Sequence, residues 1–98
     1  MKQPAVYIMA SGRNGTLYVG VTSNLEQRIW QHRTGAIPGF ASRYRCTTLV
    51  HFELYEDMTT AITREKQLKG GSRLRKLSAI EAQNPTWRDL ADPITQRA

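Results

Sequence analysis

Two short apolar stretches near the start of the chain alternate in character with a period of two. Residues 5–9 (AVYIM) and 17–22 (LYVGVT) are rich in β-branched and aromatic residues, and Gly, Ser and Asn residues separate them. The pattern predicts two antiparallel strands joined by a loop longer than the tightest hairpin turn. Tyr7 and Tyr18 fall on one face of this hairpin, opposite apolar rows that we expect to be buried. Gly20 lies beside Tyr18, where glycine often marks a close approach of another group to the backbone.

A helical pattern follows directly after the second strand. Ser23 and Glu26 fit a capping box, in which the serine side chain bonds the third helical amide and the glutamate reaches back. We expect this helix to run to about Arg33 and to end at Gly35.

One face of this helix combines apolar and basic residues. By helical spacing the face holds Leu25, Arg28, Ile29 and His32. Arg28 and His32 are one turn apart, so both side chains can act on the same spot.

A loop with aromatic anchors over residues 36–45 precedes the third predicted strand, residues 49–55 (LVHFELY). Alternation puts His51 on one side of that strand together with Glu53 and Tyr55. We expect His51 to be a solvated strand histidine rather than a ligand.

Two further helices are predicted in the second half of the chain. The first covers residues 58–69, with Asp57 or Thr59 as its cap, and the second begins after a cap at Ser72 and runs to about residue 83. Glu65 falls in the middle of an otherwise apolar stripe of the first of these helices. A carboxylate at such a position is costly unless a cation meets it.

These elements predict a single α/β (α+β) domain, in which helices flank a three-stranded antiparallel sheet. The domain covers residues 1–98, with an ordered core at about 5–90 and a frayed tail at 91–98. Trp87 and Leu90 are expected to pack back onto the core.

The charge balance adds a partner class. Lysine and arginine total 14 against 8 acidic residues, which gives a net charge of +6 and an isoelectric point near 10.0. An excess of this size favours a polyanionic partner, of which nucleic acid is the commonest. The alternative is a cationic surface that serves solubility.

Other features exclude several classes. Cys46 is the only cysteine, so the chain has neither an internal disulfide nor a zinc site built on several thiolates. No apolar run approaches the roughly 18 residues of a membrane span, and the N-terminus lacks the apolar segment of a signal peptide. We therefore expect a soluble, cytoplasmic protein with no membrane partner; its oligomeric state stays open.

Several of the residues named above depart from a simple division into buried apolar and exposed polar positions. Their order along the chain resembles that of a known family, the GIY-YIG nuclease superfamily. The matching positions are Tyr7 in AVY, Tyr18–Gly20 (YVG), Arg28, His32, Glu65 and Asn84. The resemblance runs from Val6 to Leu90 and is greatest to small stand-alone bacterial members, which carry REK-x-L-K and NP-x-W-x-DL. These motifs stand here at residues 64–69 and 84–90.

The chain also departs from the family pattern at two places. Ala5 and Val6 replace the glycine and isoleucine of the first motif. Residues 70–72 (GGS) stand where related stand-alone proteins often place a tryptophan and a basic residue, which affects the rim of the site rather than its centre.

The resemblance implies a metal-dependent endonuclease that hydrolyses phosphodiester bonds, with DNA favoured over RNA. Relatives include the nuclease module of the excision-repair incision subunit, which suggests a link to DNA repair. Their sites use both motif tyrosines, the arginine and a single metal-binding glutamate. Here Glu65 would hold Mg²⁺ or Mn²⁺, weakly without substrate, because water and phosphate oxygens must complete the ligand set.

The resemblance also suggests a role for each remaining residue. Tyr18 would be the general base or would position the water, while Tyr7 would bond the water or the phosphate. Arg28 suits the non-bridging phosphate oxygens because its planar fork matches them. His32 is the second candidate for the base, and Asn84 would orient the site or brace the terminal segment.

Simpler readings stay open for each residue. Either tyrosine could serve packing alone, and Glu65 could form a structural ion pair with Arg28 or an ordinary helical pair with Lys69. For the whole chain, the main alternative is a non-catalytic nucleic-acid-binding module with the same fold. A third is a protein-interaction subunit that uses Trp30, Trp87 and the third helix.

Overall fold

The computed structural model describes residues 3–36, 39 and 43–91. Within these residues three strands and three helices follow one another in the chain. In order they are β1 (Ala5–Ala10), β2 (Leu17–Thr22), α1 (Leu25–Thr34), β3 (Thr48–Leu54), α3 (Met58–Gly70) and α4 (Arg73–Gln83). The element types and their order agree with those predicted from the pattern. Much of the predicted loop at 36–45 lies outside the described residues.

The sheet is antiparallel, with strand order β2-β1-β3. Tyr7 in the central strand faces Gly20 in β2, whereas Tyr18 faces Met9. Tyr7 and Met9 belong to the same core layer, so both hairpin tyrosines lie on one face of the sheet, as predicted. A bulge in the pairing of β1 with β3 shifts the register after Ile8.

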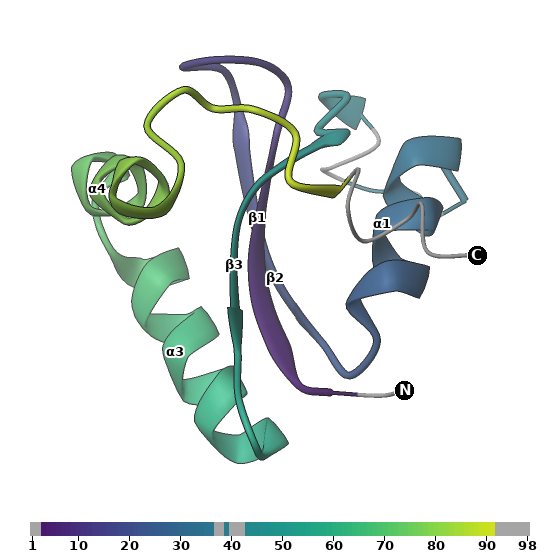
Figure 1. The fold of residues 1–98 in the computed structure, drawn as a ribbon, viewed down its shortest axis with the longest axis vertical. Coiled ribbons are helices and arrows are strands. Elements are labelled where there is room, and N and C mark those ends of the chain that lie inside the picture. The colour runs from purple at the N-terminus through teal and green to yellow at the C-terminus, as the bar shows by residue number, and fades with distance from the viewer. Residues whose placement is uncertain (1–2, 37–38, 40–42, 92–98) are drawn as a thin grey trace.

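Helices cover both faces of this sheet, in agreement with the predicted fold of a sheet flanked by helices. Helix α1 packs on one face, and α3 and α4 pack on the other (Figure 1). All six residues of β1 are therefore buried, and Tyr7 is only 1% exposed. The face that carries the tyrosines is a second core layer, shared with Leu25 and Ile29 of α1.

Side-chain caps define the helix starts. Asn24, not Ser23, is the N-cap of α1, and its side chain accepts a hydrogen bond from the Gln27 amide. Gly35 ends α1 in the left-handed conformation, at φ 71°, as expected. Asp57 caps α3 through the Thr60 amide.

The segment after α4 crosses the end of the sheet from one layer to the other (Figure 1). Trp87 packs in the layer of α3 and α4, and Leu90 packs in the layer of α1. Both placements agree with the prediction. Ala91 is also fully buried, so the core extends one residue into the predicted tail; residues 92–98 lie outside the described part of the chain.

His51 differs from its predicted environment. It lies opposite Ile8 and is 5% exposed, because α3 and α4 cover the face that local alternation left open. Its Nε2 lies 2.8 Å from Glu53, which also accepts hydrogen bonds from Tyr55 and Arg64. The network ties β3 to α3.

No described helix has the length and apolar character needed to cross a membrane.

Candidate active site

The hydroxyl of Tyr7 is held inside the molecule by a histidine from α1. It lies 2.9 Å from Nε2 of His32, and both side chains are buried. The first strand and the first helix are thus joined by a polar contact in an apolar layer. A buried hydroxyl without such a partner would be costly.

Gly20 makes room for this arrangement. A Cβ atom at position 20 would lie 2.5 Å from Cζ of Tyr7, far inside van der Waals contact. The sequence analysis took this glycine as a mark of close approach by another group to the backbone. In the structure that group is the phenol of Tyr7 from the neighbouring strand.

Tyr18 completes a cluster of three rings. The ring centroids of Tyr18 and His32 are 5.3 Å apart in an edge-on arrangement, and those of Tyr7 and Tyr18 are 6.3 Å apart. Tyr18 is only partly buried, whereas the other two rings are covered. Tyr18 is therefore the member of the cluster that reaches the surface.

Arg28 acts on this cluster from one turn earlier in α1. Burial raises the pKa of Tyr7 well above its usual value, and Tyr18 and Glu65 add to the rise. Arg28 opposes this rise through its positive charge. Burial, and then the charge of Arg28, lower the pKa of His32.

The raised pKa of Tyr7 keeps the phenol protonated at neutral pH, and the lowered pKa of His32 favours the uncharged imidazole. The tautomer of His32 decides which of the two groups donates the hydrogen bond between them.

Glu65 reaches the same region from α3. Its residue is 8% exposed, and its Oε2 lies 2.8 Å from Nζ of Lys69, one turn further along the helix. The same ammonium lies 6.0 Å from the ring centroid of Tyr18. The ion pair with this ammonium therefore brings the carboxylate near the ring cluster.

The structure thus brings together five of the six residues predicted for the site. They come from four elements: Tyr7 from β1, Tyr18 from β2, Arg28 and His32 from α1, and Glu65 from α3. The helical pairing of Glu65 with Lys69, left open above, is present, and no described ion pair joins Glu65 to Arg28.

Asn84 lies apart from this group. Its side-chain amide donates to the carbonyls of Val50 and Arg88 and accepts from the Arg88 amide. Both donor hydrogens are used on backbone groups. The structure therefore supports the second of its two expected roles, which is to brace the terminal segment, and does not place it with the predicted catalytic residues.

Lys69 is the member of the site that the sequence analysis did not single out as functional. The spacing of four residues from Glu65 was visible in the sequence, but it reads as an ordinary surface pair. Only the fold shows that this pair lies beside Tyr18.

The site could hold a metal ion only if water and substrate supply most of the ligands. Among the described residues no group of three His, Cys, Asp or Glu side chains could hold an ion together. Glu65 offers a hard carboxylate oxygen that already lies against a cation, and such a ligand fits Mg²⁺ or Mn²⁺ if water and substrate supply the other oxygens.

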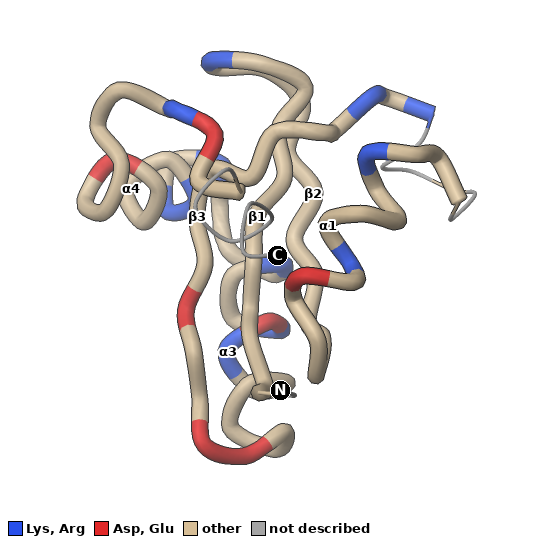
Figure 2. Tube along the Cα trace, turned by 45° about the vertical axis from the view of Figure 1, so that its right-hand side comes forward, with Lys and Arg blue, Asp and Glu red and all other residues tan. Residues whose placement is uncertain are grey.

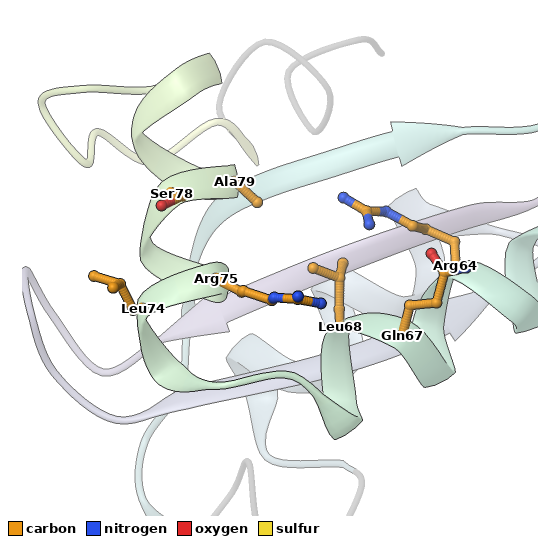
Figure 3. A pocket seen from close by; sticks show the side chains of 7 residues that line it. All are labelled: Arg64, Gln67, Leu68, Leu74, Arg75, Ser78 and Ala79. Atoms are coloured by element: carbon orange, nitrogen blue, oxygen red, sulfur yellow. The ribbon is translucent and has the colours of Figure 1, made fainter.

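A cavity of about 760 Å³ lies elsewhere, between α3 and α4 (Figure 3). Arg64 and Arg75 line it, and Arg64 is held by Glu53 on β3. None of the residues predicted for the site lines this cavity, so its size does not make it the candidate active site.

The charges are unevenly distributed over the molecule. Figure 2 shows acidic residues on β3 and on the turn that follows it, at the opposite end from the β1–β2 loop. Lys and Arg residues lie on that loop and on all three helices.

This chain belongs to the GIY-YIG family. The family's sequence model, described as the GIY-YIG catalytic domain, matches residues 3–78. The match covers Tyr7, Tyr18, Arg28, His32 and Glu65. Membership points to a nuclease in general and implies a nucleic acid as substrate.

Two relatives match this chain along nearly its whole length. A UPF0213 protein of Syntrophus aciditrophicus is 36% identical over 86 residues, covering 87% of this chain and 97% of the relative. The UPF0213 protein SH2523 of Staphylococcus haemolyticus is 35% identical over 81 residues, covering 83% and 98%. The chain therefore spans nearly the whole length of both. Their names state no activity.

A solved structure confirms the fold. The solution NMR structure of the UPF0213 protein BH0048 from Bacillus halodurans superposes with a TM-score of 0.54 and covers 89% of this chain and 92% of its own. The two sequences are 21% identical, so this likeness concerns the fold alone.

Proposed function

We propose that this protein is a divalent-metal-dependent endonuclease that hydrolyses phosphodiester bonds in nucleic acid, with DNA as the proposed substrate. The observation that carries the proposal is the convergence of a phenol, a guanidinium and a carboxylate from three different elements. The net charge of +6 supports a polyanionic substrate.

Exposure divides the site into a substrate-facing part and a supporting part. Tyr18 and Arg28 are partly exposed and can touch a nucleic acid, whereas Tyr7 and His32 are covered. In the proposed mechanism Arg28 binds the non-bridging phosphate oxygens, on which negative charge accumulates during attack. Tyr18 positions the attacking water and is the first candidate to take its proton.

Tyr7 and His32 support the reacting groups from behind. The hydrogen bond between Tyr7 and His32 fixes the imidazole, and the positive charge of Arg28 acts on the Tyr7 phenol. The lowered pKa of His32 keeps its ring uncharged at neutral pH, so it does not repel Arg28. His32 remains the second candidate for the base, because a neutral imidazole can accept a proton.

Glu65 would hold the metal ion. When bound, Mg²⁺ or Mn²⁺ supplies a Lewis acid that polarises the phosphate and lowers the pKa of a coordinated water. The burial of Glu65 keeps its carboxylate in a defined place, and an ion held there would lie near Tyr18, the group proposed to handle the water.

A cleavage assay separates this proposal from the non-catalytic alternative. Linear and branched DNA and RNA are offered with Mg²⁺, Mn²⁺ or EDTA, to the wild type and to Glu65→Gln. We expect cleavage with metal, none in EDTA, and none by the variant, which should still bind nucleic acid. A wild type that binds all substrates and cuts none, with either metal, would favour the binding module instead.

The structure weakens the third alternative, a protein-interaction subunit that uses Trp30, Trp87 and the third helix. Trp30 is 60% exposed on α1, but Trp87 is 5% exposed and its indole N–H donates to Glu81. Trp87 is therefore a core residue and does not offer a surface to a protein partner.

A further inference from the structure

The ammonium of Lys69 lies against one oxygen of the carboxylate that the proposed metal ion needs. Nζ lies 2.8 Å from Oε2 of Glu65, in the ion pair that joins these two residues along α3. The side chain of Glu65 is 11% exposed, and that of Lys69 is 55% exposed. One partner is fixed in the protein, and the other can move into water.

A buried carboxylate needs a positive charge close to it whenever no metal is bound. Without one, Glu65 would be an uncompensated charge in an apolar stripe, which strongly destabilises a fold. Lys69 meets this need from the solvent side, and the ring of Tyr18, 6.0 Å from Nζ, lines the other side of the ammonium.

The pair differs from an ordinary helical ion pair in where its two ends lie. A pair between two exposed residues contributes little and blocks nothing. Here the carboxylate lies near the ring cluster, because the ammonium that it contacts at 2.8 Å is 6.0 Å from the ring centroid of Tyr18. A cation that approaches this carboxylate meets the ammonium already in place.

We infer that Lys69 is a resident counter-cation of Glu65, which a divalent ion must displace before it can bind. This inference rests on the proposed function, because it takes Glu65 as the metal ligand. Lys69 is then a positioning residue that keeps the empty site folded and weak for metal. Its flexible stem lets the ammonium leave into water without any movement of α3.

The test measures metal binding directly, without a cleavage readout. Mn²⁺ is titrated into the full chain and the free ion is followed by electron paramagnetic resonance. Lys69→Met keeps the length of the side chain and removes its charge, so we expect Mn²⁺ to bind about ten-fold more tightly than to the wild type. Lys69→Arg keeps the charge and should bind Mn²⁺ as weakly as the wild type.

A matched control tests whether a change in Mn²⁺ affinity comes from the loss of the Lys69–Glu65 contact or from the loss of any positive charge on the same helix. Lys66 lies on the same helix, next to Glu65 in sequence, is exposed, and forms no ion pair among the described residues. Lys66→Met should change the Mn²⁺ affinity less than two-fold. Equal effects of Lys66→Met and Lys69→Met would overturn the inference.

Thermal unfolding gives a second, independent readout. In EDTA the Lys69→Met variant should melt below the wild type, because Glu65 has lost its counter-charge. Mn²⁺ should then raise its melting temperature more than it raises that of the wild type. An unchanged melting temperature in EDTA, or an equal response to Mn²⁺, contradicts the inference.

The Glu65→Gln variant shows whether a negative result overturns only the displacement by Lys69 or also the role of Glu65 as the metal ligand. Loss of Mn²⁺ binding in Glu65→Gln, with equal affinities in Lys69→Met and the wild type, would leave Glu65 as the ligand and remove only the displacement. Undiminished Mn²⁺ binding by Glu65→Gln would remove Glu65 as the ligand and the inference with it. No binding to Lys69→Met at millimolar Mn²⁺ would also overturn the displacement, while the cleavage assay would still decide the proposed function.

Discussion

At the scale of single residues, the site depends on one buried phenol and the space made for it. Tyr7 is hydrogen-bonded to His32 within a core layer, and Gly20 leaves the room that its ring occupies. Neither feature could be derived from the sequence, because both join residues that are distant in the chain. The strand pattern placed the tyrosines on one face but not Gly20 opposite Tyr7.

We expect Gly20→Ala to destabilise the protein by about 1–3 kcal/mol, the usual range for overpacking a core. The added methyl group would collide with the rigid ring of Tyr7 and push it away from His32. Urea unfolding measures the change. Gly12→Ala is the control, because nothing lies within 4 Å of its Cβ position; equal stability of the two variants would contradict the packing described here.

The lowered pKa of His32 predicts how stability depends on pH. The folded state holds the imidazole neutral below the ordinary value of 6.5, so the unfolded state binds more protons in that range. Stability should therefore fall as pH drops from about 7 towards 5.5. Urea unfolding at several pH values should show this slope in the wild type, and a smaller slope in His32→Gln. Identical slopes would mean that His32 is not the group responsible.

The lowered pKa of Glu53 predicts a second loss of stability, at more acidic pH. Hydrogen bonds from Arg64, Tyr55 and His51 overcome the effect of burial and lower the pKa of this carboxyl to about 2. Its contribution is present above the unfolded value of 4.5 and is lost as pH falls from there towards 2. Glu53→Gln should flatten the acid limb below pH 4.5 and leave the region above pH 5.5 unchanged.

At the scale of elements, much of the architecture follows from local signals. Period-two and helical patterns predicted each described strand and helix, and Gly35, Asp57 and Ser72 lie at the boundaries where they were expected. The errors have physical causes. Ser23 and Asn24 are both good caps one position apart, and only the backbone geometry selects Asn24.

The environment of His51 shows a second limit of local patterns. Alternation identified its neighbours on β3 correctly, but solvent exposure depends on what packs above a strand. Helices α3 and α4 come from later in the chain and cover that face. A residue pattern within one strand carries no information on this non-local contact.

The cap assignment gives a prediction at this scale. Asn24→Ala should destabilise the protein by about 1 kcal/mol, because the Gln27 amide loses its partner. Ser23→Ala should change stability by only a few tenths of a kcal/mol, as for most exposed positions. Urea unfolding of both variants decides the matter, and a larger loss for Ser23→Ala would restore the capping box as first predicted.

At the scale of the whole molecule, four separate elements of the chain converge on the candidate site. The residue types of the site were predictable only through the family resemblance, because Tyr7 and Glu65 are 58 residues apart in the chain. Asn84 shows the limit of that approach. It matches the family order, yet its amide is fully used in holding the terminal segment.

The charge excess predicts strongly salt-dependent binding. Each neutralised phosphate should contribute about −0.9 to the slope of log affinity against log salt on duplex DNA. Glu65→Gln allows binding to be measured without cleavage, by fluorescence anisotropy with a labelled duplex. Affinity that stays constant between about 50 and 200 mM salt would exclude a phosphate-based interface.

The most direct test of the account asks whether Arg28 and Glu65 serve one reaction. Single-turnover cleavage is measured for the wild type, Arg28→Ala, Glu65→Gln and the double variant, with Arg13→Ala/Glu56→Gln as a control of equal charge change at exposed positions. The account predicts that each single variant loses cleavage, that the double variant is no worse than the single ones, and that the control keeps cutting. Cleavage by the purified double variant at the wild-type rate would contradict it.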